Sequence, residues 1–279
     1  MPTLFVDQLT VIDFSYVHAS RGILGESWIV DIEISGDLDD QGMIFDFGNV
    51  KKQIKQTIDQ HYDHKLWIPS GLPKLNKAQS GENQVYQWQD TLQRNYTHSS
   101  PTNAIIEFGL KSINHAEMEK LIADELQQLL PQNVHAIKLT LRQESIAGAS
   151  YQYSHGLQKH EGNCQRIAHG HRSALEIYQN GTRDKALEQQ WAHQWQDIYL
   201  GTTGHIQAST DTSITFSYQA PQGHFELTLP ADRCYLLKTE STVEHIAEHI
   251  ASKLKQQHPH SSFKVKAFEG VSKGAIAQS

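Results

Sequence analysis

The chain has 279 residues, and 38% of them are hydrophobic, which suffices for one large domain or two of ordinary size. A formal net charge of −7 argues against general binding to nucleic acids or membrane surfaces, and no apolar run approaches the roughly 20 residues of a membrane span. The two cysteines, Cys164 and Cys234, exclude a disulfide framework, and the first residues lack the pattern of a secretory signal. We therefore expect a cytoplasmic protein.

The first half of the chain predicts strands and helices that bury one face each. Alternating apolar residues predict strands at three places: 3–18, 27–35 and 134–142. Asn49 is a candidate cap for a helix from residue 50 to about 62. Residues 69–84 are rich in Pro, Gly, Ser, Asn and Lys, and this composition predicts a long exposed loop. A second helix is predicted directly after residue 102, continuing to about 129.

The same order of elements recurs in the second half, which indicates a tandem repeat. The corresponding segments are a strand over 173–178, helices over 187–197 and 242–255, and a strand over 263–269. The ends of the two halves also correspond, since Glu144 and Glu269 each follow a strand and precede a Gly-Ala pair. We therefore predict two homologous units, 1–149 and 150–279, of the α+β class. Each is expected to be an antiparallel sheet with a pair of helices on one face.

Three histidines and one cysteine gather between residues 153 and 173. If His169-Gly170-His171 lies on a strand, both imidazoles face the same side, and the glycine lets a ligand approach the backbone. His155 on a neighbouring strand would complete a three-histidine zinc site with an open fourth position, as in catalytic zinc sites. Chance proximity is the alternative, because the chain contains 17 histidines. Cys164 between them favours the metal site, although only ten residues separate Glu144 from His155, too few for two full strands and a turn.

The second half resembles the 6-pyruvoyl-tetrahydropterin synthase family, whose bacterial branch includes 6-carboxytetrahydropterin synthase. The positions that carry the resemblance are His155, Cys164, His169-Gly170-His171, Thr242-x-Glu244 and Glu269. The run from His160 to His171 is similar to the carboxytetrahydropterin branch. The resemblance extends to the first half and implies two tandem T-fold units.

The first unit resembles the family in fold but lacks the zinc ligands. Phe14-Ser15-Tyr16-Val17-His18 matches the segment of the first histidine, whereas Leu24-Gly25-Glu26 stands where His-Gly-His belongs. A leucine cannot bind zinc, so no catalytic metal is expected there. This unit nevertheless keeps Asp63-His64, the only Asp-His dipeptide in the chain, for which His224 is an alternative in the second unit. We expect one composite site made from unlike halves; the alternative is that the first unit is a degenerate scaffold.

The resemblance implies a carbon-oxygen lyase that uses Zn²⁺ to convert 7,8-dihydroneopterin triphosphate into a 6-substituted tetrahydropterin with loss of triphosphate. Cys164 is then the expected base, and His64, oriented by Asp63, moves the second proton. Glu269, supported by Glu244, is expected to bind the amino-pyrimidine edge of the pterin. The 6-carboxytetrahydropterin product, and with it queuosine biosynthesis, is favoured. The alternatives are a 6-pyruvoyl-type synthase and a catalytically idle paralogue that binds a pterin or a partner. The family's ring-like assembly implies a homo-oligomer.

Overall fold

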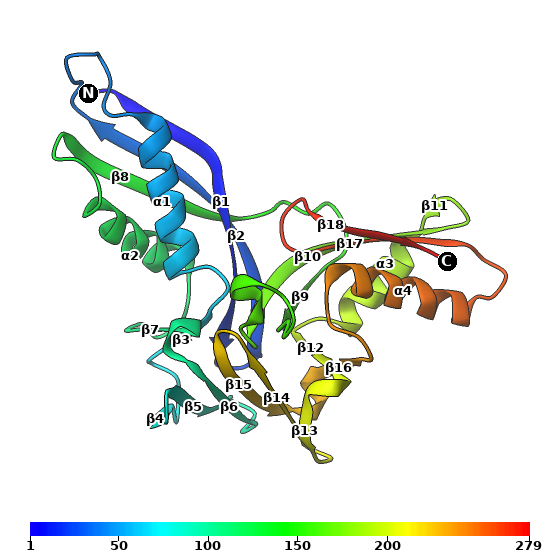
Figure 1. Cartoon of the computed structure of the whole chain (residues 1–279). Coiled ribbons are helices and arrows are strands. Elements are labelled where there is room, and N and C mark those ends of the chain that lie inside the picture. The colour runs from blue at the N-terminus through cyan, green and yellow to red at the C-terminus, as the bar shows by residue number, and fades with distance from the viewer. The chain divides into compact units, whose positions relative to one another are not determined.

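The computed structural model describes residues 1–46 and 48–279, which form two compact units that are each discontinuous in sequence (Figure 1). The first unit contains residues 1–12, 28–63 and 113–144, and the second contains residues 13–27, 64–112 and 145–279. This division follows spatial contact and does not test the boundary between the sequence repeats. No helix among the described residues is long and apolar enough to cross a membrane.

The first unit is built on a long hairpin and two helices. Strand β1 (Thr3–His18) begins in this unit and strand β2 (Gly22–Gly36) ends in it. Strand β2 pairs antiparallel with β8 (Val134–Gln143). Helices α1 (Phe47–His61) and α2 (His115–Gln127) contact each other, and α2 packs on β8 (Figure 1). The side chains they bury are Ile54, Ile58, Met118, Ile122 and Leu126.

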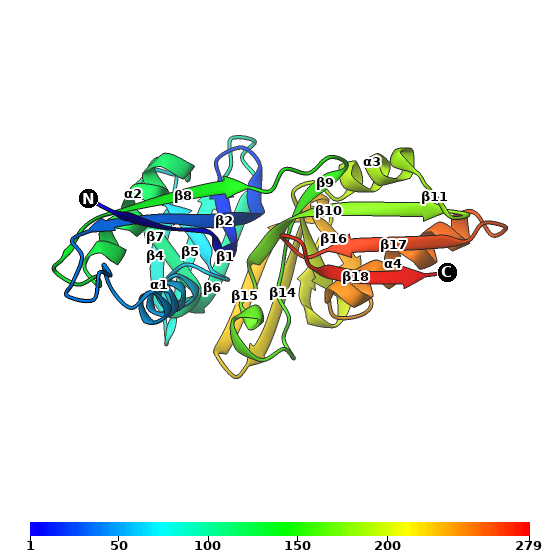
Figure 2. The ribbon, with the colours of Figure 1, turned by 90° about the horizontal axis from the view of Figure 1, so that it is seen from above.

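The second unit contains a sheet that carries helices on one face. Its strand order is β16-β12-β9-β10-β17-β18. The bounds are β9 (Ser150–His155), β10 (His169–Gln179), β12 (Ile198–Thr202), β16 (Cys234–Leu237), β17 (Phe263–Phe268) and β18 (Gly274–Gln278), with the short β11 (Thr182–Arg183) paired to β10. Helices α3 (Lys185–Gln194) and α4 (Val243–Gln257) lie against this sheet (Figures 1 and 2). Antiparallel pairing of β9, β10, β17 and β18 under two helices confirms the predicted α+β class.

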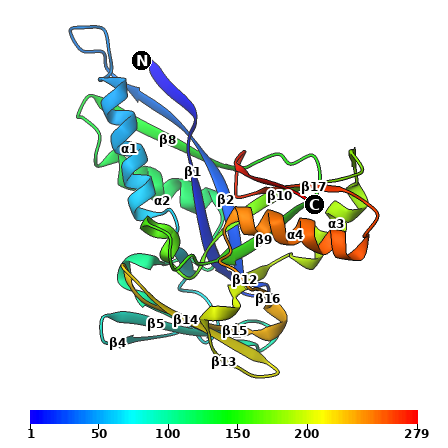
Figure 3. The ribbon, with the colours of Figure 1, turned by 45° about the vertical axis from the view of Figure 1, so that its right-hand side comes forward.

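A second sheet of this unit joins strands from both halves of the sequence. Its order is β13-β14-β15-β6-β5-β4. The sheet lies in the lower part of Figure 3. The bounds are β4 (Asn76–Ser80), β5 (Asn83–Gln89), β6 (Asn95–Pro101), β13 (Ile206–Ser209), β14 (Ser213–Ala220) and β15 (Gly223–Pro230). The joint is the antiparallel pair β6–β15, in which His98 faces Leu227.

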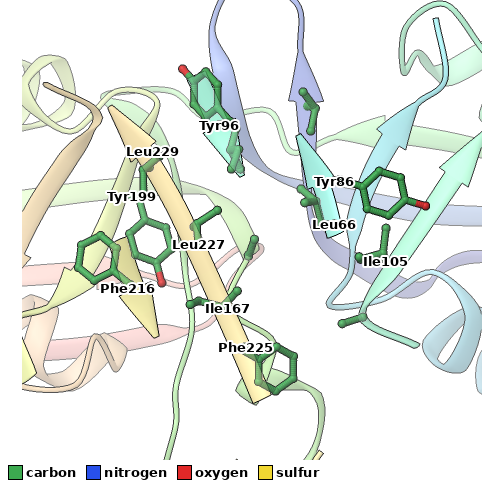
Figure 4. Close-up of a cluster of buried hydrophobic side chains, with 14 of the residues drawn as sticks. Leu66, Tyr86, Tyr96, Ile105, Ile167, Tyr199, Phe216, Phe225, Leu227 and Leu229 are labelled. Atoms are coloured by element: carbon green, nitrogen blue, oxygen red, sulfur yellow. The ribbon is translucent and has the colours of Figure 1, made fainter. Parts of the chain in front are cut away.

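One hydrophobic cluster supports this sheet. Its side chains come from both halves of the chain, for example Tyr86, Phe216, Phe225 and Leu227 (Figure 4). Two short parallel strands, β3 (Leu66–Pro69) and β7 (Ile105–Phe108), contribute Leu66 and Ile105. The two sequence halves therefore share one core, and neither half buries these residues alone.

Three local predictions need correction. The expected loop over 69–84 contains β4 and the start of β5. The helix expected from residue 102 begins only at His115, because a 3-10 turn (Thr102–Ala104) and β7 come first and the Asn114 side chain caps α2 by accepting from Glu117 N. Helix α1 is capped by Asp46, which accepts from Gly48 N and Asn49 N, and not by Asn49.

Folding stability is expected to fall in acid because of His98. This side chain is 1% exposed, its Nδ1 has no hydrogen-bond partner among the described residues, and burial lowers its pKa to about 3. Below pH ~6.5 the unfolded chain therefore binds a proton at His98 that the folded chain does not bind. The contribution of His98 to the free energy of unfolding is complete above pH ~6.5 and falls as the pH drops towards 3. Between pH 7 and pH 5 the loss from this group is about 2 kcal/mol.

His98→Leu tests this expectation in urea unfolding of the metal-free protein at both pH values. The variant should lose about 2 kcal/mol less than the wild type between pH 7 and pH 5. His260→Leu, at an exposed position, serves as the matched control and should keep the wild-type pH dependence. An unchanged pH dependence in His98→Leu would contradict the assignment.

Candidate metal centre

Three histidines meet where β9 ends and β10 begins. The antiparallel register places His169 opposite His155, and His171 follows two residues later on the same face of β10. One ring nitrogen from each of the three lies within 4.8 Å of the others, and the side chains are at most 1% exposed. The ring centroids of His155 and His169 are 4.4 Å apart. The three residues predicted as metal ligands are therefore adjacent.

The hydrogen bonds of these histidines leave nitrogens directed into the cluster. His155 Nδ1 lies 3.0 Å from the carbonyl of Ser241, and His169 Nδ1 lies 2.8 Å from the carbonyl of Arg166. An Nδ1–H that donates to a carbonyl leaves Nε2 as the lone-pair donor. The buried Nε2 atoms of His155 and His171 have no hydrogen-bond partner among the described residues. A divalent metal would satisfy these atoms, so the residues present fit a three-histidine site.

The electrostatics of the cluster favour neutral imidazoles. Burial lowers the pKa of His155 and of His169 well below the ordinary value, and the neighbouring imidazoles lower it further. Neutral imidazole is the form that binds a metal. Burial alone would raise the pKa of Asp13, but His171, Lys273 and Ser27 hold it well below its usual range.

His64 and Cys164 lie beside this cluster. Cys164 is half-buried on a 3-10 turn (Gly162–Gln165), and His64 follows α1 in the left-handed region with φ +54°. A ring nitrogen of His64, Cys164 Sγ and a nitrogen of His169 all lie within 4.8 Å of one another. The backbone fixes His64 further, because its N–H donates to the carbonyl of Asp13 at 2.7 Å. A non-glycine residue held at positive φ is a frequent feature of functional sites.

The other predicted site residues are placed as follows. Asp63 is the last residue of the first unit in this part of the chain, and its backbone N–H donates to the carbonyl of Ile58. Its expected action on His64 stays a prediction. His224 is exposed on β15 and bonds Ser217 through Nε2, in a sheet that does not contain β9 or β10.

The two predicted pterin-binding carboxylates differ in environment. Glu269 is half-buried directly after β17, and it adds to the effect of burial in raising the pKa of Tyr153. The Tyr153 ring is 5.4 Å from that of His171, which relates Glu269 to the histidine cluster. Glu244 is exposed in the first turn of α4. The neighbouring contact that the sequence did not predict is Ser241, whose carbonyl and hydroxyl both lie near His155 Nδ1.

Equivalent positions of the two repeats face each other in the second unit. Ser15 Oγ and Ser154 Oγ are 2.7 Å apart. A Cβ added to Gly170 would lie 2.6 Å from Gly25 Cα, so the central glycines of Leu24-Gly25-Glu26 and His169-Gly170-His171 are in close contact. The backbone hydrogen bonds of the two repeats confirm this correspondence. The His64 N–H donates to the carbonyl of Asp13 in the first repeat, and the Asp197 N–H donates in the same way to the carbonyl of Gln152 in the second.

This correspondence corrects one sequence match. With Ser15 equivalent to Ser154, the residue equivalent to His155 is Tyr16 and not His18. The three clustered histidines thus have Tyr16, Leu24 and Glu26 as their counterparts in the first repeat.

An ion pair lies near these counterpart residues, because Arg21 interacts electrostatically with both Tyr16 and Glu26. Arg21 Nε donates to Asp197 Oδ2 at 2.7 Å, and Arg21 Nη2 donates to Gln152 Oε1 at 2.7 Å. Gln152 Nε2 in turn donates to Glu26 Oε2 at 3.2 Å. The Arg21 guanidinium of the first repeat therefore pairs with Asp197 and Gln152 of the second.

The comparison with family models agrees with the repeat. The family model described as 6-pyruvoyl tetrahydropterin synthase matches residues 13–152 and again residues 144–278. Among solved structures, 6-pyruvoyltetrahydropterin synthase from Plasmodium vivax is 18% identical, with 52% of this chain and 93% of that chain covered and a TM-score of 0.42. The Plasmodium falciparum enzyme is 17% identical, with 50% and 90% covered and a TM-score of 0.41. No curated protein matches this chain significantly.

Proposed function

Because the chain belongs to the 6-pyruvoyl tetrahydropterin synthase family, as a member with two tandem T-fold repeats, we propose that it is a zinc-dependent lyase acting on 7,8-dihydroneopterin triphosphate. The products would be a 6-substituted tetrahydropterin, with 6-carboxytetrahydropterin favoured, and triphosphate. The observation that supports this most is the position of His169, which lies within 4.8 Å both of the histidine pair and of the Cys164–His64 pair. A metal and two proton-transfer groups would thus act on one substrate.

The roles follow from the chemistry of each side chain. His155, His169 and His171 would hold the zinc ion, which when bound would supply Lewis-acid polarisation of the substrate's side-chain hydroxyls. Cys164 would take a proton from a side-chain carbon as the thiolate, and His64 would move the second proton. Expulsion of triphosphate requires one group to remove a proton and another to move the second proton, and Cys164 and His64 would provide these two groups.

Pterin recognition is assigned to carboxylates. Glu269 would accept hydrogen bonds from the amino-pyrimidine edge, with Glu244 in support. A carboxylate suits this edge because it accepts two parallel N–H groups. Asp63 would orient His64.

The repeats and the assembly are part of the proposal. Residues 1–149 and 150–279 would be homologous units, of which the second supplies the metal ligands and Cys164 and the first supplies His64. His64 lies close to Cys164 and His169 within one chain, so a neighbouring subunit would not be needed to bring His64 to the metal site. We place the protein in the cytoplasm as a homo-oligomer.

Turnover of 7,8-dihydroneopterin triphosphate by the zinc-loaded protein tests the function. Triphosphate release together with acetaldehyde would identify the carboxy-type reaction, and release without acetaldehyde would identify the pyruvoyl type. Cys164→Ala is the control and should release no triphosphate. Pterin binding without any triphosphate release would contradict a lyase and leave the idle, pterin-binding paralogue.

A further inference from the structure

Asp13 is a buried carboxylate to which the proposed chemistry assigns no role. It lies on β1, in the half without metal histidines, and its side chain is 3% exposed. Its Oδ1 accepts a hydrogen bond from Ser27 Oγ at 2.5 Å and lies 3.2 Å from His171 Nδ1. Its Oδ2 lies 3.2 Å from Lys273 Nζ. A carboxylate this deeply buried requires partners, and one of these partners, His171, belongs to the proposed site.

His171 is the one proposed ligand whose Nδ1 faces a charged oxygen. The Nδ1 atoms of His155 and His169 face backbone carbonyls instead. Asp13 Oδ1 is close enough to His171 Nδ1, at 3.2 Å, for the carboxylate to orient a proton on that nitrogen. A carboxylate beside Nδ1 favours the proton on that nitrogen and leaves Nε2 to bind a metal.

The turn between β17 and β18 closes over the same carboxylate. Gly270 has φ +68°, and a Cβ there would lie 2.5 Å from Asp13 Oδ1 and 2.9 Å from Ser27 Oγ. The Glu269 N–H donates to the carbonyl of Lys273 at 3.0 Å, which closes the turn. The residue assigned to pterin binding and the cation that pairs with Asp13 therefore bracket one tight turn.

We propose that Asp13 is a positioning residue that fixes the tautomer and orientation of His171 and, through Lys273, joins this ligand to the turn that carries Glu269. The inference rests on the proposed zinc site. It means that the repeat without metal ligands supplies the charged group behind one of them. The first repeat would then still contribute to metal binding, although it has no metal-binding histidines of its own.

Asp13→Asn tests the first part because it removes the charge and keeps the size. Zinc affinity of the full chain, measured by competition with a chromophoric chelator, is expected to fall roughly 10–100-fold. Asp90→Asn is the matched control, since Asp90 is a 0% exposed carboxylate of the same unit that pairs with Arg94. It should keep the wild-type zinc affinity, and both variants should unfold at similar temperatures without metal.

Two results would overturn the positioning role: wild-type zinc affinity in Asp13→Asn, or an equal loss of affinity in Asp90→Asn.

Lys273→Met tests the second part, the link between Asp13 and the turn that carries Glu269. It should raise the KM for the pterin substrate while zinc affinity stays within roughly fivefold of wild type, because Lys273 is half-exposed and its ion pair is weak. An unchanged KM would contradict the link to the turn. Zinc affinity is measured without substrate, so a negative lyase assay and a negative Asp13 result remain distinguishable.

Discussion

Replacing His64 is expected to lower kcat by roughly 10²–10⁴-fold while the protein still binds zinc, because one of two proton-transfer groups is lost and the three ligands remain. Asparagine is the substitution of choice, since His64 has φ +54° and asparagine tolerates this region better than alanine. The backbone contacts of residue 64 with Asp13 and Arg166 are then retained. The measurements are single-turnover triphosphate release and bound zinc.

The matched control is His18→Asn. His18 lies on β1, and its ring accepts from the backbone of Ser20 and Arg21, away from the proposed machinery. This variant should keep wild-type turnover. If His64→Asn also turns over at the wild-type rate, the first repeat is a scaffold with a remnant Asp-His pair, and the composite site is wrong.

Replacing His155 with alanine is expected to lower zinc affinity by more than ~100-fold, and turnover with it. Loss of a partner behind a metal ligand costs about 10–100-fold in affinity, so loss of the ligand itself should cost more. His155 also decides between the two possible groupings, because His64, Cys164 and His169 form a second set within the same distance limit. Chelator competition and metal content after dialysis measure the effect.

His205→Ala is the control for this experiment. His205 is a similarly buried histidine of the same unit that contacts Gln158 and Glu240 instead of the cluster. It should retain zinc. If His155→Ala binds zinc as tightly as the wild type, the metal belongs with Cys164 and His64, and the thiol is a ligand and not a base.

The strands that the sequence did not predict share a physical cause. All five residues of β4 are exposed, so its sequence lacks the apolar alternation that marks a half-buried strand. Its place in the sheet depends on β5 and β6, and β6 pairs with β15 from the other half of the chain. Strand β7 likewise forms because it pairs in parallel with β3. Pairing between strands far apart in the sequence, such as β6 with β15, leaves no local pattern.

The sequence alone determined what depends on short-range periodicity. Two residues apart on a strand, His169 and His171 must face the same side, and the repeated order of elements predicted two units that the family model also matches. Only the tertiary structure decided which other residues lie beside His169 and His171. The approach of His64 to Cys164, the carboxylate of Asp13 behind His171, and the equivalence of Tyr16 with His155 all depend on how the repeats pair. That register is set by contacts across more than a hundred residues, through the facing glycines Gly25 and Gly170, and no local pattern encodes it.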